Sequence, residues 1–170
     1  MRKLWWVGLV VMVLCFAMPT MAQNYSPLQA EVGYTLLHVT CCGFSATANG
    51  ANADVFYNAN HWLSLGGDFA GTTSNAFGPG TTIITYQFGP RIYFSRGTFQ
   101  PFAQVLLGGV HISQGGASVN AFNFDLGGGV DIKVSQHFGV RPVELGYERF
   151  SLFGTGFNNL RYSAGINFYF

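Results

Sequence analysis

Apolar and polar residues alternate along most of this chain, and the C-terminal segment NNLRYSAGINFYF shows the pattern most clearly. One set of alternate positions is apolar: Leu160, Tyr162, Ala164, Ile166, Phe168 and Phe170. The positions between them are mainly polar or small: Asn159, Arg161, Ser163, Gly165, Asn167 and Tyr169. Successive side chains of a β-strand point to opposite faces, so this segment is predicted to be a two-faced strand.

Eight segments are predicted to be strands, and no helical period competes with them. They cover residues 30–39, 51–58, 62–70, 83–94, 99–112, 121–134, 138–150 and 158–170. Short connections at 58–61, 95–98 and 135–137 alternate with longer ones at 40–50, 71–81, 113–120 and 151–157. Short connections at one end and long ones at the other are typical of an up-and-down antiparallel barrel in an outer membrane.

Apart from Arg96 in the short connection 95–98, the charged residues of the mature chain lie within the predicted strands, and the four longer connections contain none. In segment 121–134, for example, Asp125 and Asp131 share one face and Phe124 and Leu126 share the other. A soluble barrel turns its apolar face inward, and a membrane barrel turns it outward. Small and charged residues suit the narrow interior of eight strands, while the apolar face suits hydrocarbon. The sequence therefore predicts an all-β fold, a closed eight-stranded antiparallel transmembrane barrel.

Composition supports this interpretation, because 9% of the residues are charged against about 25% in an ordinary soluble domain. Residues 1–22 have a basic start, an apolar run and small residues at the end, so we predict a signal peptide that is cleaved after Ala22. The barrel domain then covers residues 23–170. Elsewhere no apolar run approaches the roughly 20 residues of a spanning helix. The chain has no basic run or patch, so we expect no nucleic-acid partner.

Segment 138–150 is the exception to simple alternation. Arg141 is predicted to point inward, and strict alternation from Arg141 then turns Glu144 and Glu148 outward. These two residues must instead point inward if Leu145 is to face lipid. A β-bulge near Pro142 reconciles the two halves of the strand, and a proline within a paired strand itself favours one.

Three segments, NNLRYSAGINFYF, PFAQVLLGGV and NANHWLSLGGDFAG, resemble the small eight-stranded outer-membrane barrels of the OmpA/OmpX-like superfamily. The resemblance covers essentially the whole mature chain and implies a location in the bacterial outer membrane. Ile166, Phe168 and Phe170 are similar to the C-terminal signal that the barrel-insertion machinery recognises. The expected partners are therefore outer-membrane lipid and, during biogenesis, that machinery, while the partner of the surface loops is left open.

The inward charged residues form the first candidate site. They are Glu31, Asp54, Asp68, Arg91, Asp125, Asp131, Lys133, Arg141, Glu144, Glu148 and Arg161. Eight strands leave an interior just filled by side chains, so we expect paired charges to plug the lumen. The alternative is an ion path, which makes the protein a narrow porin-like channel.

His111 and Ser113 form the second candidate site, at the loop end of segment 99–112. Lipid A deacylases are similar barrels that use a His and a Ser two positions apart on the lipid-facing surface. A serine with a histidine base can transfer an acyl group if an acid orients the imidazole, but the neighbouring connections contain no Asp or Glu. A lipid A-modifying acyl hydrolase is thus the alternative to a non-enzymatic structural or surface-interaction role.

The remaining residues with reactive side chains suggest no further chemistry. The adjacent Cys41 and Cys42 are expected to be idle or structural, and their redox state is left open. His38, His61 and His137 fall at strand ends or in turns, where surface hydrogen bonds are expected. No metal site and no cofactor is predicted.

Overall fold

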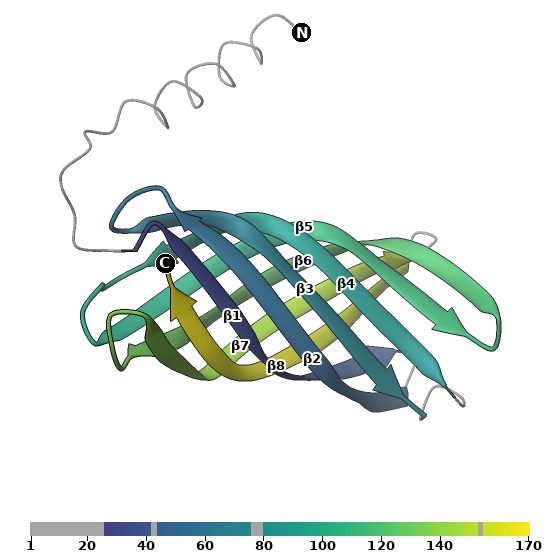
Figure 1. Ribbon diagram of the computed structural model, residues 1–170. Coiled ribbons are helices and arrows are strands. Elements are labelled where there is room, and N and C mark those ends of the chain that lie inside the picture. Colours follow the sequence, from purple (N-terminus) through teal and green to yellow (C-terminus); the bar gives the residue numbers. More distant parts are fainter. Residues whose placement is uncertain (1–25, 42–43, 76–79, 153–154) are drawn as a thin grey trace, which may run out of the picture.

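The chain forms a single closed barrel of antiparallel strands in the computed structural model, which describes residues 26–41, 44–75, 80–152 and 155–170 (Figure 1). The strands are β1 (Leu28–Cys41), β2 (Phe44–Asn58), β3 (Leu63–Ser74), β4 (Thr81–Tyr93), β5 (Phe99–Gln114), β6 (Ala117–Lys133), β7 (Phe138–Leu152) and β8 (Thr155–Tyr169). Each strand pairs with its neighbours in sequence, and β1 pairs with β8 to close the sheet. The predicted fold is confirmed.

Alternate residues point into and out of the barrel, as the sequence predicts. On β1, Val32 and Tyr34 are 51% and 54% exposed, whereas Glu31 and Thr35 are fully buried. Because the polar side chains lie inside, the outer surface is dominated by Phe, Tyr, Leu, Val and Ile. The described residues include no helix that is long and apolar enough to cross a membrane.

The start of β1 and the C-terminus lie side by side at one end of the barrel, which we call the terminal end (Figure 1). The β2–β3, β4–β5 and β6–β7 connections lie at the same end. The other four connections lie at the opposite end, which we call the loop end.

The prediction of long connections at the loop end is wrong for three of the four, and the exception is residues 75–80 between β3 and β4. Most of residues 40–50, 113–120 and 151–157 belong to strands, and pairing extends to Thr40↔Ser45 and Gln114↔Ala117. The turn between β5 and β6 is only Gly115–Gly116, with φ of 55° and 87°, a conformation that suits a tight two-residue hairpin turn. In these segments outward polar residues such as Thr47 and Asn49 still alternate with inward residues that are small or apolar, such as Ala46 and Ala48. The two-faced strand pattern, and with it the ladder of hydrogen bonds, therefore continues.

The predicted bulge near Pro142 is confirmed. The register between β7 and β8 shifts between Arg141 and Glu144, and the register between β6 and β7 shifts between Val130 and Ile132. The extra residue lets both Arg141 and Glu144 point inward, each 1% exposed. The signal peptide and the second cysteine of the Cys41–Cys42 pair lie outside the described residues.

Candidate functional site: the barrel lumen

Arg141, next to the bulge on β7, lies at the centre of the lumen and contacts carboxylates from three strands. Its Nη1 is 2.7 Å from both Asp54 Oδ2 on β2 and Glu144 Oε2 on β7. Its Nε is 2.7 Å from Asp131 Oδ1 on β6. All four side chains are at most 1% exposed. Charge-assisted hydrogen bonds of this length are among the strongest in proteins, so one guanidinium group holds three strands together.

Arg91 on β4 shares a carboxylate with Arg141. Its Nη2 lies 2.7 Å from Asp54 Oδ2, and its Nε donates to Gln104 Oε1 at 2.9 Å. The guanidinium also lies 3.7 Å from the ring centroid of Phe56 and 4.5 Å from that of Phe102. Two aromatic faces therefore replace part of the water that this cation has lost on burial.

Arg161 on β8 extends the same network toward the loop end. Its Nη1 is 2.6 Å from Asp68 Oδ1 and 3.2 Å from Glu148 Oε1, and its Nη2 is 3.1 Å from Glu144 Oε1. Because Glu144 also binds Arg141, ion pairs run without interruption between β2, β3, β4, β6, β7 and β8.

Seven carboxyl groups face three guanidinium groups in this lumen, so several carboxyl oxygens are held by amides instead. Asn52 Nδ2 donates to Glu31 Oε2 at 2.8 Å, and Gln104 Nε2 donates to Asp125 Oδ2 at 3.3 Å. Asp125 lies directly opposite Glu148 in the pairing of β6 and β7. Among the described residues, no three His, Cys, Asp or Glu side chains are grouped in a way that could hold a metal ion.

Lys133 does not join the network, which corrects the sequence-based assignment. It is the last residue of β6, at the terminal end, and its Nζ lies 4.8 Å from the ring centroid of Tyr169. Arg96 lies nearby in the β4–β5 turn, with its guanidinium 3.7 Å from the Tyr93 ring. Lys133 lies at an inward position of β6, like Asp131. Because it is the last residue of the strand, at the end of the barrel, its side chain is only half-buried. The other ten predicted residues, which we call the lumen charge network, are at most 4% exposed.

An apolar layer lies on the loop-end side of the network, and sequence reasoning missed it. We call this layer the apolar cap. It consists of Leu37, Val39, Ala48, Ile83, Val110 and Phe150, each at most 7% exposed. Phe150 follows Glu148 on β7 at the next inward position, so cap and network are in direct succession along the lumen. The apolar cap could have been predicted from the sequence. Its residues occupy the inward alternate positions of their strands on the loop-end side of the last charged residue.

His111 and Ser113 lie at the loop end of β5, away from every carboxylate. His111 Nδ1 is 2.7 Å from Asn120 Oδ1, its cross-strand neighbour on β6, and Ser113 pairs across the strands with Ser118. All seven acidic residues of the chain belong to the lumen charge network. The structure therefore brings His111 to an amide rather than to the acid that a catalytic triad needs.

The residues of the predicted C-terminal signal lie on the outer face at the terminal end. Ile166, Phe168 and Phe170 are 40%, 37% and 64% exposed. The Phe168 ring packs edge-on against Phe138 with 6.1 Å between centroids, and Phe170 N donates to Leu28 O at 2.9 Å. Their use by an insertion machinery stays a prediction.

A closed antiparallel barrel with charges inside and hydrocarbon side chains outside defines a transmembrane β-barrel. The family model for the outer membrane protein beta-barrel domain matches residues 8–170, and the chain belongs to this family. It is a protein of the bacterial outer membrane.

Solved structures show the same fold at low sequence identity. The chain is similar to Neisserial surface protein A, with 14% identity and a TM-score of 0.70 over 87% of this chain and 100% of that one. It is similar to Ail, the attachment invasion locus protein of Yersinia pestis, with 17% identity and a TM-score of 0.55 over 85% and 99% of the two chains. The outer membrane protein OprG from Pseudomonas aeruginosa gives 8% identity and a TM-score of 0.56 over 86% and 97%. No curated protein sequence matches the chain.

Proposed function

We propose that this protein is a non-enzymatic outer-membrane barrel with a plugged lumen, and that it acts through its outer surfaces in a structural or surface-interaction role. The observation that carries the proposal is the filling of the lumen by two successive layers, the lumen charge network and the apolar cap. An ion that crosses the barrel has to disrupt buried ion pairs and then pass a layer in which apolar side chains predominate and only a few neutral polar groups, such as Asn123 and Thr72, lie beside them to replace its water.

The distribution of charge indicates which end of the barrel faces outward. The loop-end connections carry no charged residue, whereas Arg96 and Lys133 lie at the terminal end. Moving an uncharged hairpin through hydrocarbon costs less than moving a charged one, so the loop end is the end that crosses the membrane to the cell surface. Thr, Ser, Asn and Gly then form the exposed rim, which suits neutral polar partners.

The names of two structural relatives are consistent with a surface role. One is called a surface protein and the other an attachment invasion locus protein. The hydrolase alternative has less support, because His111 lies beside Asn120 and the carboxylate of every acidic side chain is buried in the lumen.

Conductance measurements in planar lipid bilayers test the plug. We expect the purified barrel to give no conductance steps under conditions in which a general porin conducts. Heat-modifiable migration on gels, tested on protein recovered from the bilayer mixture, shows that the inserted protein is folded. Reproducible conductance steps from folded barrel contradict the plug and favour the narrow channel.

Lipid analysis tests the non-enzymatic part of the proposal separately. The acyl pattern of lipid A is expected to be the same in cells that express the wild-type protein, the His111→Ala variant or no copy of this protein. A pattern that changes with the wild-type protein but not with His111→Ala supports the hydrolase instead.

A further inference from the structure

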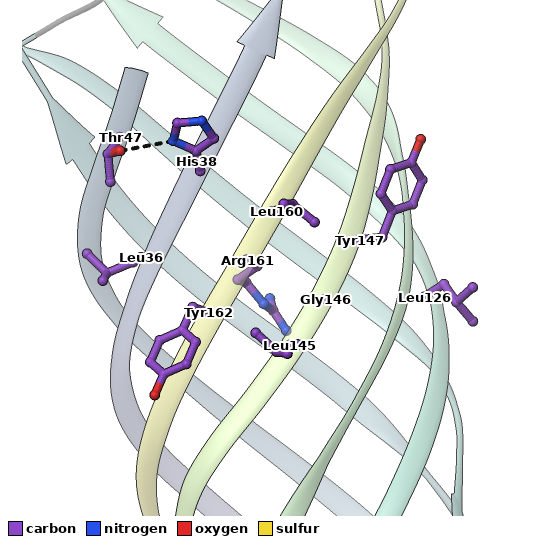
Figure 2. Close-up of a pocket in the computed structure, with 10 residues that line it drawn as sticks. All are labelled: Leu36, His38, Thr47, Leu126, Leu145, Gly146, Tyr147, Leu160, Arg161 and Tyr162. Carbon is purple, nitrogen blue, oxygen red and sulfur yellow. Dashed lines mark hydrogen bonds between the residues drawn. The ribbon is translucent and has the colours of Figure 1, made fainter. Parts of the chain in front are cut away.

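The outward surface of β1, β2, β6, β7 and β8 contains a groove of about 560 Å³, which we call the outer groove (Figure 2). Its walls are aliphatic and aromatic: Leu36, Leu126, Leu145, Leu160, Tyr147 and Tyr162. Gly146, which has no side chain, lies between these walls. A pocket of a few hundred Å³ with apolar walls is the usual form of a small-molecule or chain-binding site.

The loop-end margin of this groove is polar. His38 and Thr47 lie side by side at this margin, with 3.1 Å between His38 Nδ1 and Thr47 Oγ1 (Figure 2). On the other side of the groove, Tyr147 Oη donates to Asn158 Oδ1 at 2.7 Å. The groove is therefore amphipathic along the barrel axis, with hydrocarbon walls toward the membrane centre and hydrogen-bonding groups toward the cell surface.

A cation lies next to this margin. Arg149 is the next outward residue after Tyr147 on β7, and it pairs across the strands with Asn158. A Cβ atom on Gly156 would lie 2.9 Å from both Nε and Nη2 of Arg149, so the guanidinium extends from β7 across the outer surface of β8. Since all seven carboxylates are inside the barrel, none is available outside to neutralise Arg149.

The position of Arg149 is distinctive among the basic residues of the described chain. Arg91, Arg141 and Arg161 are buried in the lumen, and Arg96 and Lys133 lie at the terminal end. Arg149 alone combines the loop-end half of the barrel with an outward, exposed side chain. An unneutralised cation beside an apolar groove complements an anionic head group that carries hydrocarbon chains.

We propose that the outer groove binds one acyl chain of the phosphorylated glycolipid of the outer leaflet, the lipid A part of lipopolysaccharide, and that Arg149 binds its phosphate. The acyl chain lies along Leu145, Leu160 and Leu36, and the sugar hydroxyl groups face His38 and Asn158. This site depends on the membrane location and on the orientation of the loop end, and it is independent of whether the lumen conducts ions.

Lipid that remains bound during purification tests the site. The protein is extracted from outer membranes in mild detergent, and lipopolysaccharide per barrel is measured by native mass spectrometry. We expect Arg149→Gln, which removes the charge, to reduce the bound lipid about tenfold, the scale of one lost hydrogen bond to a charged group. Leu145→Trp fills the groove, and we expect it to reduce the bound lipid as well.

Two matched controls separate the groove from the general lipid annulus. Lys133→Gln removes a charge at the terminal end, and Leu107→Trp enlarges another residue of the outer face, on β5 and outside the groove, which is 50% exposed against 59% for Leu145. Both are expected to retain the wild-type amount of lipid, and heat-modifiable migration checks that all four variants are folded. Equal losses in the groove variants and the controls, or no loss in either groove variant, overturn the proposal.

Competition with defined lipids identifies the ligand. Purified diphosphorylated lipid A is expected to displace bound lipopolysaccharide from the wild-type barrel, and dephosphorylated lipid A is expected to compete about tenfold less well. Phosphatidylglycerol that competes as well as lipid A contradicts the assignment to the outer-leaflet glycolipid.

Discussion

At the scale of single residues, Arg141 contributes most to the cohesion of the lumen, because it holds Asp54, Asp131 and Glu144 within 2.7 Å. Replacing it with methionine keeps a long side chain but takes the paired guanidinium from Asp131 and leaves Asp54 and Glu144 with one close cation each, Arg91 and Arg161. We expect Arg141→Met to reduce the free energy of unfolding by about 3–5 kcal/mol. Urea titration in detergent, followed by the gel shift between folded and unfolded barrel, measures the change.

Lys133→Met is the matched control at the terminal end. Its ammonium group contacts the Tyr169 ring and is half-buried, so its loss is expected to change the free energy of unfolding by less than about 1 kcal/mol. Similar effects of the two substitutions would show that the lumen charge network does not stabilise the barrel.

The same two residues show what sequence patterns predict at this scale and what they do not. Alternation identifies the face on which Arg141 and Lys133 lie, because the strand period is two. It does not give the depth of a residue along the barrel axis, which depends on register and on where each strand ends. For this reason the sequence assigned both residues to one network, and the structure separates them.

At the scale of elements, the bulge in β7 decides the orientation of several charges. Deleting Pro142 removes the extra residue and leaves Arg141 and Glu144 two positions apart, so both keep the inward face in a regular ladder. Deleting Leu145, where the ladder is already regular, instead turns at least one charged residue of β7 toward lipid and breaks its ion pairs. We expect the Pro142 deletion to fold into a heat-modifiable barrel in lipid vesicles and the Leu145 deletion to fail.

Pro142→Ala is the control for this prediction. Pro142 is exposed on the outer face, so the substitution keeps the residue count and every inward side chain. It is expected to fold with near wild-type yield. Efficient folding of the Leu145 deletion, or failure of the Pro142 deletion, would contradict the role assigned to the bulge.

The bulge was predictable from the sequence because the conflict in parity falls beside a proline. The length of the strands could not be predicted, because polar residues such as Thr47 and Asn49 are typical of loops and only their pairing partners show that they belong to a strand. The outer groove was also hidden, because its walls come from five strands whose alignment only the register provides.

At the scale of the whole molecule, the alternation of residues and the closure of the sheet have one physical cause. Every backbone group in hydrocarbon must be hydrogen-bonded, and a closed sheet with its apolar face outward meets this requirement. Because this constraint acts on all eight strands, the fold and its location could be predicted from the sequence. The lipid and partner preferences could not, because they depend on a few surface residues such as Arg149.

The accessibility of spin labels along β8 in lipid vesicles tests this orientation most directly. Nitroxides placed one at a time at Leu160, Tyr162, Ala164, Ile166 and Phe168 are expected to collide often with oxygen, which dissolves in hydrocarbon, and rarely with a water-soluble nickel complex. Frequent collisions with the nickel complex along this whole series would mean that water covers the Leu, Tyr and Phe face, and the barrel would not lie in the membrane as described.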